Sequence, residues 1–451
     1  MEIQELIIGP IYFVVILLVA YANRGVAGDG EMQKHFLRGL LLKLVGSIFV
    51  YIVYFFIYRG GDSTTYYNNA LLLNDALYND IFIAIKLYYK DPKVYDFDTY
   101  LWFRSLNAED TSSYFLVKVT SIFSVFCFYS YLGIAYLLSV LSFAGIWRMF
   151  KMFTKIYPQH IDKLAISFLY IPSVFFWGSG LLKDTITIGF LGFLVSAIYY
   201  IAIMRKNIIW NLLLIMISVY MIGILKGYIL MAMIPAIILW IFITYRSKIK
   251  SKLTKALVTP LLIIVIAVLG YVILNALGNT FQKFSLDNLE MKAKGMQTWH
   301  TYVVDVLNDG QGSSYNLGDL DYSVTGIIKK IPAAINVALF RPYLWEIRSS
   351  IMLLSAGESL VILFFTLSAI WYFFKHFYFA VKFIGDNPTI IFMLVFSLVF
   401  AFSVGFSSYN FGALSRYRIP LLPFYIAAIF IVRGELKQYD TYLEKKKYYL
   451  L

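Results

Sequence analysis

Apolar runs long enough to cross a membrane recur along the whole chain instead of gathering in one place. A spanning helix needs about 20 apolar residues, and on that measure the sequence predicts about eleven spans. They are expected at about 7–22, 38–58, 131–150, 164–180, 184–204, 208–225, 229–246, 256–277, 351–375, 389–406 and 419–433. Because 60% of the residues are hydrophobic and only 14% are charged, we expect an all-α, polytopic bundle with one membrane domain over 1–451.

The distribution of Lys and Arg predicts the side that each loop faces. The segments rich in these residues and poor in Asp and Glu are 22–38, 147–163, 204–207, 245–255, 375–388 and 433–451. Short basic loops stay in the cytoplasm. The amino terminus is therefore expected outside and the carboxyl terminus inside, in a bacterial cytoplasmic membrane. The net charge of +13 is explained by these loops and by contact with anionic lipid, not by nucleic-acid binding.

Two polar segments, 59–115 and 278–350, are predicted to lie outside the membrane. The first combines short apolar runs with many tyrosines, a pattern typical of amphipathic helices in the outer interface. An apolar piece at about 114–128 is too short to span and is expected to be re-entrant or interfacial. The second segment contains a glycine-rich turn at 308–314 and then an amphipathic helix at about 323–339. A long loop of this kind is typical of a substrate lid.

Four short charged clusters are predicted at the outer ends of their spans. They are Gly60-Gly61-Asp62, Leu182-Lys183-Asp184, Phe340–Arg348 and Ser415–Arg418. Charge at the rim of the hydrocarbon is costly, so residues of both signs in such places indicate a polar site. We expect the four clusters to meet at one membrane face and to bind an ionic, phosphorylated substrate.

Asp62 and Asp184 are the candidate catalytic carboxylates. Asp62 follows two glycines that allow close approach of a ligand, and a carboxylate there could take a proton from a sugar hydroxyl. Alternatively, Asp62 caps the helix that follows it. Lys183 and Asp184 interrupt two apolar runs, so Lys183 could pair with a phosphate while Asp184 orients it or acts as the base. Alternatively, these two residues form a local ion pair that closes a hairpin.

The candidate substrate-binding residues at the end of the second outer segment are Arg341, Trp345, Glu346 and Arg348. Two guanidinium groups within two helical turns suit bidentate recognition of a diphosphate. These residues carry the phosphate site in this interpretation.

Arg416, Arg418 and Lys226 are further cations at predicted outer ends. The two arginines precede Pro420 and are candidates for substrate binding, with anchoring to lipid headgroups as the alternative. Lys226 is a further candidate for substrate binding, although snorkelling to the headgroups explains a lone cation there more simply. Glu358 lies inside its predicted span, so we expect it to neutralise an arginine or to act as a second carboxylate.

No cofactor is expected, with binding of a divalent cation as the alternative. The four histidines have no ligand spacing, Cys127 is the only cysteine, and no glycine-rich phosphate loop occurs. These absences argue against ATP-driven transport and against a thiol-based metal site.

On these features the chain resembles the GT-C class of integral-membrane glycosyltransferases. An outward Asp62 after an early span, interfacial helices after it and a long late outer loop carry the resemblance. The arginine-lined outer loops also resemble Wzy-type polysaccharide polymerases, and the break at Ser179–Ile188 resembles EpsG-like members. In the GT-C class the acid usually follows the first span, whereas Asp62 follows the second.

The resemblance implies transfer of a glycosyl unit from a polyprenyl-phosphate or polyprenyl-diphosphate donor on the outer face. The acceptor would be a glycan, a lipid or a protein in the assembly of cell-envelope polysaccharide or glycoconjugate. A flippase or transporter of a lipid-linked oligosaccharide is the main alternative, and it predicts a polar path through the membrane centre. The third possible function is that of a structural partner in an envelope complex, in which the charged residues serve only as anchors.

Overall fold

The computed structural model describes residues 3–90, 92, 94, 96–106, 108, 110–247, 249, 295, 298, 314–318, 324–348 and 350–448. Within these residues the secondary structure is helical, apart from one isolated bridge between Ser314 and Asn410. The chain divides into two compact units. The first contains Met1–Lys155 and Val174–Lys226, and the second contains Ile156–Ser173 and Gly227–Leu451.

The protein is an all-α, multi-pass membrane protein, as the sequence predicts. Among the described residues, eight helices are long and apolar enough to span a bilayer, or nine if one bent helix pair is a single span. The eight are Gln4–Ala22, Gly30–Ile57, Tyr131–Ile156, Lys183–Ile203, Ile208–Lys226, Tyr228–Arg246, Met352–Lys375 and Pro388–Ser407. Each coincides with a predicted span, whereas the predicted span 256–277 lies outside the described residues.

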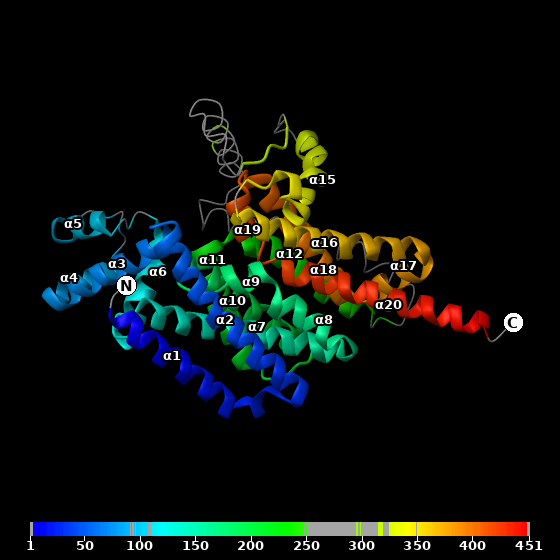
Figure 1. The fold of residues 1–451 in the computed structure, drawn as a ribbon, viewed down its shortest axis with the longest axis horizontal. Helices are drawn as coiled ribbons and strands as arrows, with labels where there is room; N and C mark the ends of the chain where they lie inside the picture. The colour runs from blue at the N-terminus through cyan, green and yellow to red at the C-terminus, as the bar shows by residue number, and fades with distance from the viewer. Residues whose placement is uncertain are drawn as a thin grey trace. The chain divides into compact units, whose positions relative to one another are not determined.

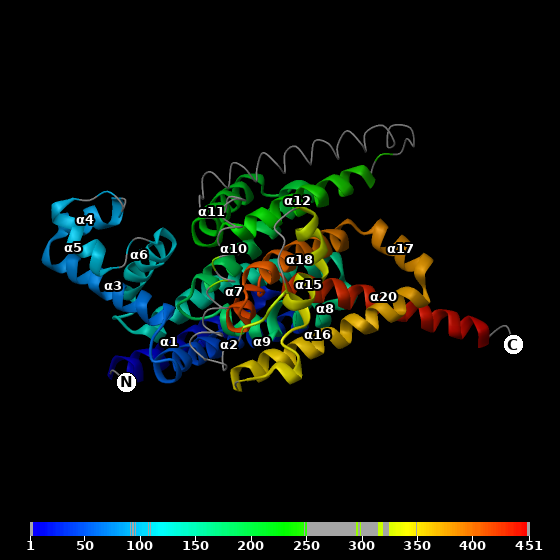
Figure 2. The ribbon, with the colours of Figure 1, turned by 90° about the horizontal axis from the view of Figure 1, so that it is seen from above.

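The first unit is built from five of these spans and a group of shorter helices. Its helices are α1 (Ile3–Ala22), α2 (Gly30–Ile52) with a short π-helix (Val53–Ile57), α3 (Asp62–Asn79), α4 (Ile81–Tyr89), α5 (Phe97–Ser105), α6 (Thr111–Phe126), α7 (Tyr131–Ile156), α10 (Lys183–Ile198) and α11 (Ile208–Lys226). Helix α9 (Pro172–Trp177) begins in the second unit and continues into the first from Val174. Helices α3 to α6 lie together in both ribbon views (Figures 1 and 2). Helices α7 and α10 touch through their backbones, since a Cβ at Gly145 would lie 1.9 Å from the carbonyl oxygen of Gly189.

A buried acid joins α1 to α7. Glu5 accepts hydrogen bonds from the backbone N–H groups of Tyr131 at 2.5 Å and Leu132 at 3.0 Å, and from the hydroxyl of Ser130 at 3.1 Å. The first N–H groups of a helix have no partner within it, and a carboxylate there also meets the positive end of the helix dipole. Glu5 therefore caps α7 from another helix.

The second unit contains the remaining spans and ends with the carboxyl-terminal helix. Its helices are α8 (Ile161–Ala165), α12 (Tyr228–Ser247), α15 (Val324–Phe340), α16 (Ser350–Lys375), α17 (Phe377–Asp386), α18 (Pro388–Ser407), α19 (Phe411–Tyr417) and α20 (Leu422–Tyr448). Buried aromatic rings fix the packing of α12 on α18: Trp240 stacks on Phe392 with 4.6 Å between ring centroids and donates to Thr389 at 3.2 Å. Figure 1 shows α20 running to the carboxyl end of the chain.

Two of the predicted spans are not single straight helices in the structure. Residues 164–180 are not one helix, because α8, a π turn (Ile166–Tyr170) and α9 are separate pieces. Ile171 has an extended backbone with ψ 122°, as expected for a residue before a proline, and Pro172 then begins α9. The predicted span 419–433 falls in a bent pair, in which α19 and α20 meet at 70°.

The predicted outer segments are partly described. Segment 59–115 contains α3, α4, α5 and the beginning of α6, so its predicted helices are present, and α6 is too short to span. Phe82, Tyr89 and Phe97 are among the apolar side chains that α4 and α5 leave exposed, which fits an interfacial location. In segment 278–350, the predicted helix at 323–339 is confirmed as α15. The predicted turn at 308–313 lies outside the described residues.

Candidate functional site

The predicted site residues belong to both units. Asp62, Lys183, Asp184 and Lys226 lie in the first unit, whereas Arg341, Trp345, Glu346, Arg348, Arg416 and Arg418 lie in the second. The convergence of these groups on one membrane face stays a prediction. Each unit contains its own polar cluster.

Asp184 and Lys226 form a buried ion pair in the first unit. Asp184 lies in the first turn of α10 and Lys226 is the last residue of α11, and the two side chains are 1% and 7% exposed. The ammonium of Lys226 donates to the carboxylate of Asp184. Lys226 therefore points into the protein, and snorkelling to the headgroups is the wrong explanation for it.

Lys183 binds a different carboxylate, so the predicted local pair between Lys183 and Asp184 is wrong. Its Nζ lies 3.0 Å from Oδ2 of Asp110 and donates to the hydroxyl of Ser112 at 2.7 Å. Asp110 immediately precedes α6 and also accepts a hydrogen bond from Ser113 at 2.6 Å. Lys183 thus connects the beginning of α10 to the beginning of α6.

A lysine inside α2 supports the break before α10. Lys43 is buried, and its Nζ donates to the carbonyl oxygen of Gly178 at 2.5 Å and lies 3.4 Å from the hydroxyl of Ser142. One turn further, Ser47 and Ser139 are hydrogen-bonded at 2.7 Å, and Ser139 accepts from the N–H of Gly180 at 2.9 Å. Irregular backbone inside a membrane needs such partners. In the described part of the chain, Lys43 has no carboxylate partner.

Asp62 is the first residue of α3 and is exposed. The N-cap position belongs to Gly61, so Asp62 is not the cap residue itself. Its carboxylate lies in the first turn, where the helix dipole favours a negative charge. The structure therefore leaves this carboxylate accessible from outside the protein.

The second unit contains a small cavity with arginines in its wall. The cavity has a volume of about 220 Å³ and is lined by Ser314, Tyr315, Asn316, Arg341, Trp345, Glu346, Arg348, Met352 and Phe411. The guanidinium carbon of Arg341 lies 5.2 Å from the ring centroid of Phe411 and 5.8 Å from that of Tyr315. A cation near aromatic ring faces is attracted by their quadrupoles.

Glu346 neutralises Arg341 inside this cavity. The Nε of Arg341 donates to Oε1 and Oε2 of Glu346 at 2.9 and 3.0 Å, and Nη2 also contacts Oε1. Burial raises the pKa of Glu346, but the hydrogen bonds from Arg341 and from the Tyr343 N–H, with the nearby positive charges, lower it by more. The pKa of Glu346 therefore lies below its ordinary value, and the pair stays ionised at neutral pH.

Arg418 is buried and contacts the backbone of Arg341, so lipid anchoring is the wrong explanation for it. Its side chain is 1% exposed and pairs with Glu358 at 3.1 Å. It also donates to the hydroxyl of Ser359 at 2.9 Å and to the carbonyl oxygen of Arg341 at 3.2 Å. Glu358 accepts in addition from the N–H and the hydroxyl of Ser173, both at 2.8 Å. Arg418 therefore positions the backbone of Arg341, and Glu358 neutralises an arginine as predicted.

The remaining predicted residues lie at or near the surface. Trp345 is 81% exposed and stacks on Tyr343 with 4.8 Å between ring centroids. Arg348 is exposed on the rim of the cavity, and Arg416 is half-buried in α19. These groups are accessible to a ligand, unlike Arg418 and Asp184.

Sequence reasoning missed Lys43, Asp110 and Ser359 as parts of these clusters. The sequence could have indicated Lys43, because a lysine inside an apolar run is costly unless it has a polar partner. Asp110 and Ser359 gave none, since polar residues near helix ends are common. No protein-family model, curated protein or solved structure matches the chain.

Proposed function

We propose that the protein transfers a glycosyl unit from a polyprenyl-phosphate or polyprenyl-diphosphate donor to a glycan or another acceptor in envelope assembly. The observation that carries the proposal is the cavity at Arg341 and Arg348, where two arginines and an exposed tryptophan lie together. Such a group suits an anionic headgroup whose apolar tail stays in the lipid. The loop charges favour the outer face of a bacterial cytoplasmic membrane.

Arg341 keeps one donor for a substrate. Nε and Nη2 bind Glu346, whereas Nη1 makes no hydrogen bond within the described residues. A phosphate in the cavity would accept from this Nη1 and from the exposed Arg348. As the bond between the sugar and the phosphate breaks, the negative charge on the leaving phosphate grows, and these donors stabilise it.

Asp62 is the better of the two candidate bases. Asp184 is 1% exposed and paired with Lys226, so it reaches a substrate only if that pair breaks. The proposed reaction uses the convergence of the charged clusters that the sequence predicts: the exposed Asp62 accepts the proton of the acceptor hydroxyl, and the hydroxyl oxygen forms the new bond to the anomeric carbon. The donor phosphate leaves with the electron pair of the broken bond.

Arg341→Lys should lower the rate of transfer at least about tenfold, which corresponds to roughly 1.4 kcal/mol of transition-state stabilisation. A lysine has one point of charge, so it can bind Glu346 or the phosphate but cannot reach both as the planar guanidinium does. The rate is measured with a lipid-linked sugar donor and purified protein. Lys382→Arg, on the exposed surface of α17, is the matched control and should retain the wild-type rate. Near-normal turnover of Arg341→Lys would remove Arg341 from the phosphate site.

A further inference from the structure

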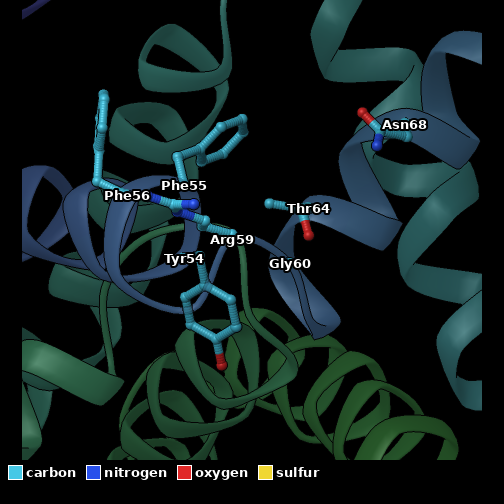
Figure 3. A pocket seen from close by; sticks show the side chains of 7 residues that line it. All are labelled: Tyr54, Phe55, Phe56, Arg59, Gly60, Thr64 and Asn68. Atoms are coloured by element: carbon cyan, nitrogen blue, oxygen red, sulfur yellow. The ribbon is translucent and has the colours of Figure 1, made fainter.

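A second cavity, of about 490 Å³, lies in the first unit where α2 ends and α3 begins. It is lined by Tyr54, Phe55, Phe56, Arg59, Gly60, Thr64 and Asn68. Figure 3 shows the aromatic side chains and Arg59 on one side, with Thr64 and Asn68 across from them on α3. The predicted phosphate site at Arg341 and Arg348 belongs to the second unit, and Arg59 is not among the predicted site residues.

Arg59 is the feature of this cavity that points to an anion. The residue is exposed, and its side chain has no hydrogen-bond or ion-pair partner among the residues that the structure describes. Its backbone has φ +52°, a left-handed conformation that is uncommon for residues other than glycine. Directly after a helix, a residue in this conformation ends the helix and turns the chain.

The cavity walls also suit the rest of a saccharide. Phe55 and Phe56 offer apolar ring faces, on which the C–H face of a sugar packs. Thr64 and Asn68 are four residues apart, so their polar ends lie on the same face of α3. The Thr64 hydroxyl donates to the carbonyl oxygen of Gly61 at 2.8 Å and keeps acceptor capacity, while the exposed Asn68 amide offers two donors and an acceptor.

The loop between α2 and α3 has a backbone conformation that favours glycine. The N–H of Gly60 donates to the carbonyl oxygen of Tyr54 at 3.0 Å, which turns the chain back over α2. Gly61 has φ +112°, and a Cβ there would lie 3.1 Å from the Tyr54 ring. Both the conformation and the close contact favour glycine at this position.

We infer that this cavity binds a saccharide that carries a phosphate or carboxylate group, and that this saccharide is the glycan acceptor of the proposed transfer. Its role as acceptor rests on the proposed function, whereas the binding itself does not. The volume is within the range of ligand sites and exceeds that of the cavity at Arg341, which suits a sugar ring as well as its charged group. The exposed Asp62 directly follows Gly61, so a bound acceptor would lie beside the proposed base.

Binding of glucose 1-phosphate, glucose and inorganic phosphate to the full-length protein in nanodiscs tests the inference by calorimetry. Glucose 1-phosphate should bind more tightly than either of the other two. Arg59→Gln should weaken its binding at least about tenfold, because the charge is lost from a site that keeps its shape. Asn68→Ala should weaken binding of glucose 1-phosphate but leave that of inorganic phosphate unchanged. Arg104→Gln, an exposed arginine on α5, is the matched control and should bind as the wild type does.

Three results would overturn the inference. Wild-type affinity in Arg59→Gln would remove the arginine from the site. Equal affinity for inorganic phosphate and glucose 1-phosphate would reduce the cavity to a simple anion site, and loss of binding in nanodiscs rich in phosphatidylglycerol would assign it to lipid headgroups. If the wild type binds glucose 1-phosphate but transfers no sugar, the binding stands and the acceptor role fails with the proposed function.

Discussion

Arg418→Met is expected to destabilise the folded protein by about 3 to 5 kcal/mol. The substitution keeps much of the side-chain volume but leaves the carboxylate of Glu358, 7% exposed, without its cationic partner. It also removes the donor that Arg418 gives to the carbonyl oxygen of Arg341. Unfolding by sodium dodecyl sulfate in mixed micelles measures the change in the free energy of unfolding.

The double variant R418M/E358Q tests the cause of this loss. Glutamine keeps acceptor capacity for the N–H of Ser173 but has no charge, so the double variant should be more stable than Arg418→Met alone. Lys382→Met, on the exposed face of α17, should change the stability by less than about 0.5 kcal/mol. An effect of Arg418→Met as small as that of Lys382→Met would contradict a buried ion pair.

Lys226→Met should cause a comparable loss, about 3 to 5 kcal/mol, in the first unit. Asp184 would then stay buried between α10 and α11 without the ammonium that neutralises it. The double variant D184L/K226M removes both charges and should recover most of the stability, because an apolar pair of similar volume often replaces a buried ion pair without cost.

The exposed Lys206, before α11, provides the control for this pair. Lys206→Met should unfold at the same detergent concentration as the wild type. If D184L/K226M were as unstable as Lys226→Met, the loss would come from packing and not from an unpaired carboxylate. The comparison also tests the choice of Asp62 as the base, because Asp184 is the weaker candidate only while Lys226 binds its carboxylate.

The membrane spans could be predicted from the sequence because one local property, apolar length, determines them. The eight long apolar helices coincide with predicted spans. The prediction of one continuous span at 164–180 is wrong because it rests on hydrophobicity alone. Pro172 lies inside this apolar run and is a signal for a break in the helix. Apolar length gives no information about where such a run bends.

The partners of the charged side chains could not be predicted, because they depend on which helix ends meet in space. Asp184 and Lys226 are 42 positions apart, and two neighbouring antiparallel helices bring them together. Arg418 and Glu358 are 60 positions apart and meet through the bend between α19 and α20. By contrast, Arg341 and Glu346 are only five positions apart, so the sequence alone assigns them to one cluster.

The burial of some predicted site residues changes their roles. Arg418 and Asp184 were candidates for contact with substrate, but each is held by an opposite charge inside the protein. The accessible candidates are Asp62, Trp345, Arg348 and Arg416, with Arg341 at the cavity wall. The polar groups around Lys43 bind one another and the backbone near Gly178, and they line neither of the two cavities described above.

The most direct test of glycosyl transfer is product formation by the wild type and Asp62→Asn, with donor binding measured on the same preparations. The purified protein is given a radiolabelled polyprenyl-diphosphate sugar and an acceptor glycan. We expect the wild type to form product, and Asp62→Asn to bind the donor normally but to form almost none, because asparagine cannot accept the proton. Absence of product from the wild type with donor bound, or full activity in Asp62→Asn, would contradict this account of the protein and of its base.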